Sequence, residues 1–139
     1  MLLAFALAFQ ASAQITIKGK TETKLIATLA TQWNWLYQID DTYILCIKSD
    51  NQFDDSYDLI LGKTRNECLE SLSALMEFCT LPVGETYEIE NGGRTFSVGR
   101  HSLMGEKSMS IFGSGHAGHG IVNLQALKKA VKYFNGLKE

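Results

Sequence analysis

The stretch TRNECLESLSALMEFC (residues 64–79) decides the fold class, because it combines a helix start signal with an apolar stripe. Thr64 and Glu67 form a capping box, in which each side chain accepts a hydrogen bond from the other residue's backbone N–H. Apolar residues then recur at spacings of three and four, the period of one helix face: Cys68, Leu69, Leu72, Leu75, Met76 and Cys79. Pro82 stops the helix. A helix with one apolar stripe needs another layer to cover that stripe.

Alternating residues before this helix indicate that the other layer is a β-sheet. We predict strands over residues 25–30, 33–39, 42–48 and 57–62, where large apolar side chains recur at every second position. The segment TYILCIK (residues 42–48) is apolar on both faces, which is typical of a strand in the middle of a sheet.

The sequence after the helix predicts a hairpin, another strand and a second helix. In ETYEIENGGRTFSVG (residues 85–99), Asn91-Gly92 suits a two-residue turn that places Tyr87 opposite Phe96. Residues 107–113 form the next predicted strand. Asn123 then caps a helix that runs to residue 135, where Asn135-Gly136 predicts a left-handed C-cap. The apolar stripe of this helix consists of Leu124, Leu127, Val131 and Phe134.

These elements predict the α+β class. We expect an antiparallel, meander-type sheet of about six or seven strands with two helices packed on one face, in the order ββββ-α-βββ-α. At 139 residues the chain has the usual size of one domain, which we place at residues 14–139. The two halves are alike in element order alone, each a meander closed by a helix.

Charge excludes two classes of partner. Thirteen basic and 15 acidic residues are scattered along the chain and give a net charge of -2. A protein that binds nucleic acid or an anionic membrane surface needs a cluster of basic side chains, which this sequence lacks. We therefore expect no nucleic-acid partner.

The first residues have the pattern of a secretory signal. The apolar run MLLAFALAF (residues 1–9) precedes Ala11-Ser12-Ala13, the small-residue pattern of a cleavage site. We predict a signal peptide at residues 1–13 and export to a periplasmic or extracellular location. The run is shorter than the roughly 20 residues of a spanning helix, so we expect no stable membrane span. The alternative is an N-terminal strand or helix that is buried in the fold.

Three cysteines leave at least one thiol unpaired. Cys68 and Cys79 lie on one predicted helix, about 16 Å apart along its axis, which is too far for a disulfide. Cys46 remains a candidate partner for either one. The alternative is three buried thiols that act as small apolar side chains.

The loop GSGHAGHG (residues 113–120) holds two candidate metal ligands. Its G-x-G-x-x-G pattern lacks the following strand and acidic residue of a dinucleotide site, so we expect no nucleotide cofactor. Together with His101, the imidazoles of His116 and His119 would suit a transition metal such as zinc. The alternative is a flexible, glycine-rich surface loop with solvated histidines.

Trp33, Trp35 and Tyr37 form an aromatic row on one side of a predicted strand. If the helices cover the other side, the row is exposed and marks a surface for a protein partner, a second copy or a sugar ring. The alternative is that the row forms the core beneath the helices.

The functional prediction is an exported, non-enzymatic binding protein, of the size of inhibitors, immunity proteins and adaptors. It would act through a sheet face or edge on another protein or on a second copy, without a cofactor. One alternative is a small metal-dependent or histidine-using hydrolase with its site in the loops from His101 to His119. Another is a structural subunit of a larger assembly.

Overall fold

The capping box predicted at Thr64 is present in the computed structural model, which describes residues 19–30, 32–51, 56–103, 106–113 and 115–137. The Thr64 hydroxyl accepts a hydrogen bond from the Glu67 N–H (3.2 Å), and the Glu67 carboxylate accepts one from the Thr64 N–H (3.1 Å). The helix that follows, α2 (Arg65–Phe78), buries Cys68, Leu72 and Leu75. The apolar stripe therefore faces the core as predicted.

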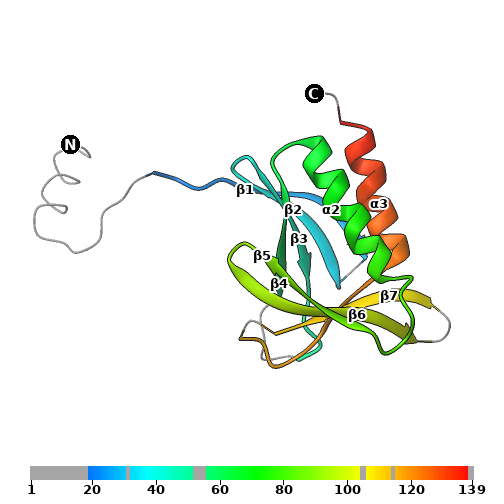
Figure 1. The fold of residues 1–139 in the computed structure, drawn as a ribbon. Coiled ribbons are helices and arrows are strands. Elements are labelled where there is room, and N and C mark those ends of the chain that lie inside the picture. Colours follow the sequence, from blue (N-terminus) through cyan, green and yellow to red (C-terminus); the bar gives the residue numbers. More distant parts are fainter. Residues whose placement is uncertain (1–18, 31, 52–55, 104–105, 114, 138–139) are drawn as a thin grey trace, which may run out of the picture.

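In the residues that the structure describes, eight strands form two antiparallel sheets. Figure 1 shows how the sheets are arranged relative to the helices. Sheet A has the order β1-β2-β3-β4, and sheet B has the order β5-β6-β7-β8. The strands of sheet A are β1 (Thr23–Ala30), β2 (Asn34–Ile39), β3 (Thr42–Ile47) and β4 (Tyr57–Gly62). Those of sheet B are β5 (Thr86–Asn91), β6 (Arg94–Leu103), β7 (Glu106–Phe112) and β8 (Gly120–Asn123).

The α+β class and the antiparallel pairing are confirmed, but the prediction of one sheet with six or seven strands is wrong. Helix α2 separates β4 from β5 along the chain and contacts strands of both sheets. Alternation shows which face of a strand is buried, but it does not show which strand is the neighbour. The element order is ββββ-α-ββββ-α, with β8 as the unpredicted strand.

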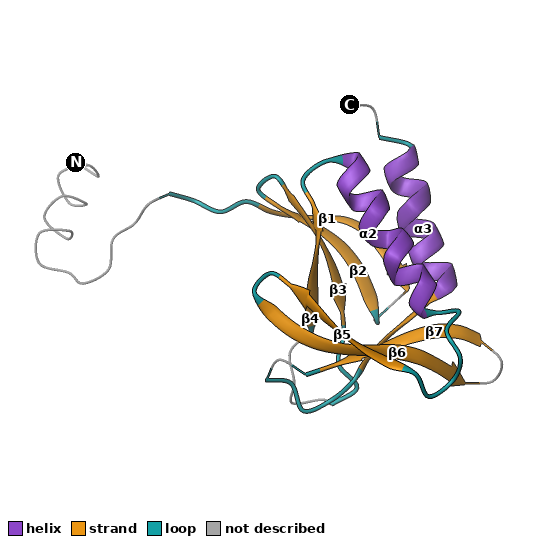
Figure 2. Cartoon of the chain, viewed as in Figure 1, coloured by secondary structure: helices purple, strands orange, loops and turns teal. Residues whose placement is uncertain are grey.

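The two helices lie side by side and form one layer (Figure 2). Helix α3 (Leu124–Asn135) packs against α2, β1 and strands of sheet B. Asn123 caps it as predicted, since the Asn123 side chain accepts a hydrogen bond from the Ala126 N–H (2.7 Å). Its end differs from the prediction: Gly136 has a right-handed backbone (φ -83°), because its N–H still bonds the carbonyls of the last turn.

Both sheets and both helices share one core. The aromatic contacts show how the layers meet: Tyr57 of sheet A packs edge-to-face on Phe96 of sheet B, and Tyr43 packs edge-to-face on Phe134 of α3. The largest buried side chains come from all of these elements: Leu36, Leu45, Ile47, Tyr57, Leu59, Leu72, Phe96, Val98, Met109, Ile111, Leu127 and Phe134.

The β5–β6 hairpin turns one residue later than predicted. Gly92 and Gly93 both have positive φ (60° and 77°) and form the turn, so Ile89 pairs with Phe96, and Tyr87 pairs with Val98. Each β5 residue therefore pairs with a β6 residue two positions later than predicted. Because side chains alternate between the faces with a period of two, every side chain stays on its predicted face. Asn91 is released from the turn to bond the edge of sheet A: its side-chain amide pairs with the Ile60 N–H (2.7 Å) and C=O (2.9 Å).

Candidate functional site

The structure divides the aromatic row. Trp35 and Tyr37 lie on β2 and are half-buried, whereas Trp33 lies in the turn before β2 and is 51% exposed. Leu36, between Trp35 and Tyr37, is fully buried and belongs to the core. Trp35 and Tyr37 therefore face away from the helices, while Trp33 belongs to a different surface.

Trp35 and Tyr37 are part of an apolar surface that we call the outer face of sheet A. Cross-strand pairing places Tyr37 beside Leu25 and Ile44, and none of these three belongs to the core cluster. Leu25 is 52% exposed and Ile60 is 39% exposed. The outer face of sheet A consists of Thr23, Leu25, Thr28, Trp35, Tyr37, Ile39, Thr42, Ile44, Cys46, Asp58 and Ile60. Asp58 is the only charged residue in this set.

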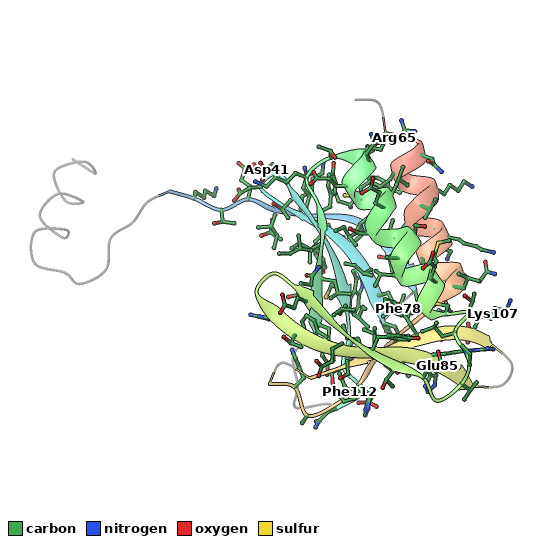
Figure 3. The ribbon with its side chains drawn as sticks, in the orientation of Figure 1. Asp41, Arg65, Phe78, Glu85, Lys107 and Phe112 are labelled. Carbon is green, nitrogen blue, oxygen red and sulfur yellow. The ribbon has the colours of Figure 1, made fainter. Side chains whose placement is uncertain are left out.

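The three histidines contact three different partners. The His116 ring lies against Tyr57 (centroids 4.1 Å apart), and the His119 ring lies against Phe112 (5.0 Å). His101 is on β6, where it pairs with Ser108. Figure 3 shows Phe112 on the side of sheet B away from the helices. Within the described ranges, no three His, Cys, Asp or Glu side chains gather into a metal-binding group.

The glycine-rich loop before β8 is anchored in the part that the structure describes. The Tyr57 hydroxyl donates a hydrogen bond to the Gly118 carbonyl. Asp50 receives a hydrogen bond from the His119 N–H (2.7 Å) and donates its own N–H to the His119 carbonyl (2.7 Å). Gly118 lies so close to Asp50 that a Cβ atom there would be 2.5 Å from the carboxylate. These contacts hold the described part of the glycine-rich loop against the β3–β4 connection. The alternative to a metal site in the sequence analysis was a flexible loop with solvated histidines.

A pocket that sequence reasoning missed lies where the two sheets meet. It has a volume of about 310 Å³ and is lined by the β1–β2 turn, the end of β3, and β7 and β8. Its walls include Trp33 and His119, two residues that the sequence assigned to separate candidate sites. The remaining lining residues are Ala30, Asn34, Lys48, Asp50, Glu106, Ser108, Ile121 and Asn123.

Hydrogen bonds between the sheets hold the walls of this pocket in place. The Asn34 amide nitrogen on β2 donates to the Ile121 carbonyl on β8 (3.1 Å) and to the Trp33 carbonyl (2.8 Å). Ser49 and Gly120 form an isolated β-bridge between the two sheets. On the opposite wall, the Asn123 amide donates to the Glu106 carboxylate (2.6 Å).

The three cysteines are free, buried thiols. Cys46 pairs with Asp58 on the outer face of sheet A, whereas Cys68 and Cys79 face the core from α2 and its C-cap. A sheet therefore lies between Cys46 and either candidate partner. Burial raises the pKa of each thiol to about 11. The thiols stay protonated at neutral pH, so they are poor nucleophiles and poor metal ligands.

No described helix has both the length and the apolar character that crossing a membrane requires. The predicted signal peptide at residues 1–13 lies outside the described residues. Comparisons of the chain with family models, with curated proteins and with solved structures found no match. The function therefore has to be inferred from the geometry of this chain.

Proposed function

We propose that the protein is an exported, non-enzymatic interaction domain that binds a second copy of itself through the outer face of sheet A. The observation that carries the proposal is the position of α2 and α3. Both helices pack on the inner side of the sheet, and no residue of the outer face of sheet A belongs to the core cluster of the described protein. The tip of the β5–β6 hairpin, at Gly92, lies close to this face at Ile60. Export is supported by the apolar run at residues 1–9 and the Ala11-Ser12-Ala13 pattern that follows it.

The composition of the outer face of sheet A favours burial. Water-exposed sheet faces are usually polar, whereas this one presents Leu25, Tyr37, Ile44 and Ile60 around the half-buried Trp35. Removing such side chains from water stabilises an interface by roughly 25 cal/mol per Å² of apolar area. Sheet B shows the contrast, because its outward residues at the β5–β6 hairpin are the exposed Glu88, Glu90 and Thr95.

A second copy is the partner that fits this surface best. Sheets pack face to face about 10 Å apart, and a twofold dimer requires a patch that is complementary to itself. A nearly uncharged face meets this condition, since Asp58 is its only charge and lies on the edge strand β4. Homodimer interfaces are also more apolar than other protein interfaces.

Strand spacing sets the expected strength of the dimer. Four strands about 4.8 Å apart, with about six residues each, give a face of roughly 400 Å². This is half of the roughly 800 Å² that each partner buries in an interface of standard size. We therefore expect a weak dimer whose population depends on protein concentration.

Sedimentation equilibrium of the purified protein over a wide concentration range tests the proposal. We expect the average mass of the wild type to rise with concentration from that of one chain towards that of two. The variants Leu25→Glu and Tyr37→Glu should suppress this rise, because each places a charge in the interface. Thr95→Glu is the matched control, because Thr95 is exposed on the outer side of sheet B. Circular dichroism verifies that each variant is folded. A constant mass of one chain at the highest concentration, or equal association of Tyr37→Glu and wild type, would overturn the proposal.

A further inference from the structure

The pocket between the sheets is lined by two nearly buried residues, each with a polar atom that bonds no other group of the described protein. Asn34 and Ser108 line the pocket and are each 2% exposed. The Asn34 amide nitrogen bonds two carbonyls, which leaves its Oδ1 for the pocket. In the part of the chain that the structure describes, neither Asn34 Oδ1 nor the Ser108 hydroxyl has a hydrogen-bond partner. These two atoms are open to the pocket, where a polar ligand can form hydrogen bonds with them.

The pocket also contains two carboxylates, from Asp50 and Glu106, and one ammonium group, from Lys48. Asp50 accepts the His119 N–H through Oδ1, and Glu106 accepts the Asn123 amide through Oε1. Each carboxylate is held by this bond and keeps its second oxygen as an acceptor. Together with Asn34 Oδ1, these oxygens favour a ligand that is rich in hydrogen-bond donors.

Trp33 provides an apolar wall beside these acceptors. Its ring is half-exposed and lines the pocket together with the half-buried Ile121. The Lys48 ammonium already lies 5.8 Å from the Trp33 ring centroid, which makes the ring a poor site for a second cation. The two carboxylates of Asp50 and Glu106 outnumber the single Lys48 ammonium, so the net charge of these three groups disfavours an anion. A cation and an anion are thus both disfavoured, and the Trp33 ring favours an apolar surface on the ligand. A neutral ligand with an apolar face meets all of these requirements.

We infer that this pocket binds one neutral sugar ring. The C–H face of the ring would lie against Trp33, and its hydroxyl groups would donate hydrogen bonds to Asn34 Oδ1 and the two carboxylates. The Ser108 hydroxyl can donate as well as accept, so it suits a sugar oxygen. The volume of about 310 Å³ lies at the lower end of small-molecule sites and limits the occupant to about one ring. No residue of the pocket belongs to the outer face of sheet A, so the site is independent of the proposed dimer.

Ligand-observed NMR with glucose, galactose, mannose and N-acetylglucosamine tests the inference. We expect saturable binding of at least one sugar, with choline and acetate as charged comparators that bind more weakly. Trp33→Ala should weaken binding roughly tenfold, the effect of losing one good aromatic contact. Trp35→Ala is the matched control: it lies on the outer face of sheet A, so it should weaken dimerisation and leave sugar binding unchanged.

Ser108→Ala separates binding from folding. The hydroxyl has no partner in the described protein, so its removal should leave the stability unchanged or raise it, while sugar affinity falls. Three results would overturn the inference: no saturable binding by any of the four sugars, equal binding by Trp33→Ala and wild type, or tighter binding of choline or acetate than of every sugar.

Discussion

Asn34→Ala tests whether one side chain holds the two sheets together. Asn34 is 2% exposed, and its amide nitrogen donates to the Ile121 carbonyl on β8 and the Trp33 carbonyl in the adjacent turn. Each such bond contributes roughly 1 kcal/mol net, so we expect the variant to lose about 2 kcal/mol of unfolding free energy. For a chain of this length, that loss corresponds to a fall in Tm of about 8 °C.

Urea denaturation followed by tryptophan fluorescence measures this loss, because Trp33 and Trp35 lie beside Asn34 in the chain. Asn34→Asp should be less stable still, since it removes both donors and places a buried negative charge next to carbonyl oxygens. Asn66→Ala, at an exposed position of α2, should stay within about 0.5 kcal/mol of wild type. If Asn34→Ala also stays within that range, the contact does not join the sheets.

Two further predictions concern the pH dependence of stability. Hydrogen bonds from Thr64, its backbone N–H first, lower the pKa of Glu67 below 4.5, so this stabilisation is present above pH 4.5 and is lost as the pH falls through the folded value. Glu67→Gln should therefore flatten the acid side of a plot of Tm against pH, and an unchanged acid slope would contradict the role of the capping box. On the alkaline side, burial raises the pKa of the three thiols from 9.0 to about 11. The folded protein then keeps protons that the unfolded chain releases, so stability should be constant below about pH 9 and fall as the pH rises to 11. Ellman's reagent should detect these thiols only after unfolding, and rapid reaction of the native protein would show that they are accessible.

Local signals predicted the helices and most strands because each depends on a few neighbouring residues. The Thr64 and Asn123 caps and the two apolar stripes specify α2 and α3 without information from the rest of the chain. Strand β8 was missed because it has four residues, begins at Gly120 and follows a glycine-rich loop. Its place in the sheet depends on pairing with β7, a tertiary contact.

The candidate site was predictable only in part. The row containing Trp33, Trp35 and Tyr37 was recognised, but its division was not, because Gln32 turns the chain with positive φ (69°) directly before Trp33. The pocket joins Trp33 and Asn34 to Ser108 and Ile121, which lie more than 70 positions further along the sequence. No local pattern reports a contact of that range, so the pocket becomes visible only when the two sheets are placed together.

The Asn91 amide on the edge of β4 has a consequence for aggregation. An open sheet edge offers free N–H and C=O groups to any other chain, and repeated addition there produces fibres. By occupying both backbone groups of Ile60, Asn91 blocks this edge at the point where an exposed isoleucine would otherwise favour strand addition. One side chain thus distinguishes two forms of self-association: the proposed closed pair uses the face of sheet A, whereas Asn91 occupies the edge at the position where a further strand would have to bond.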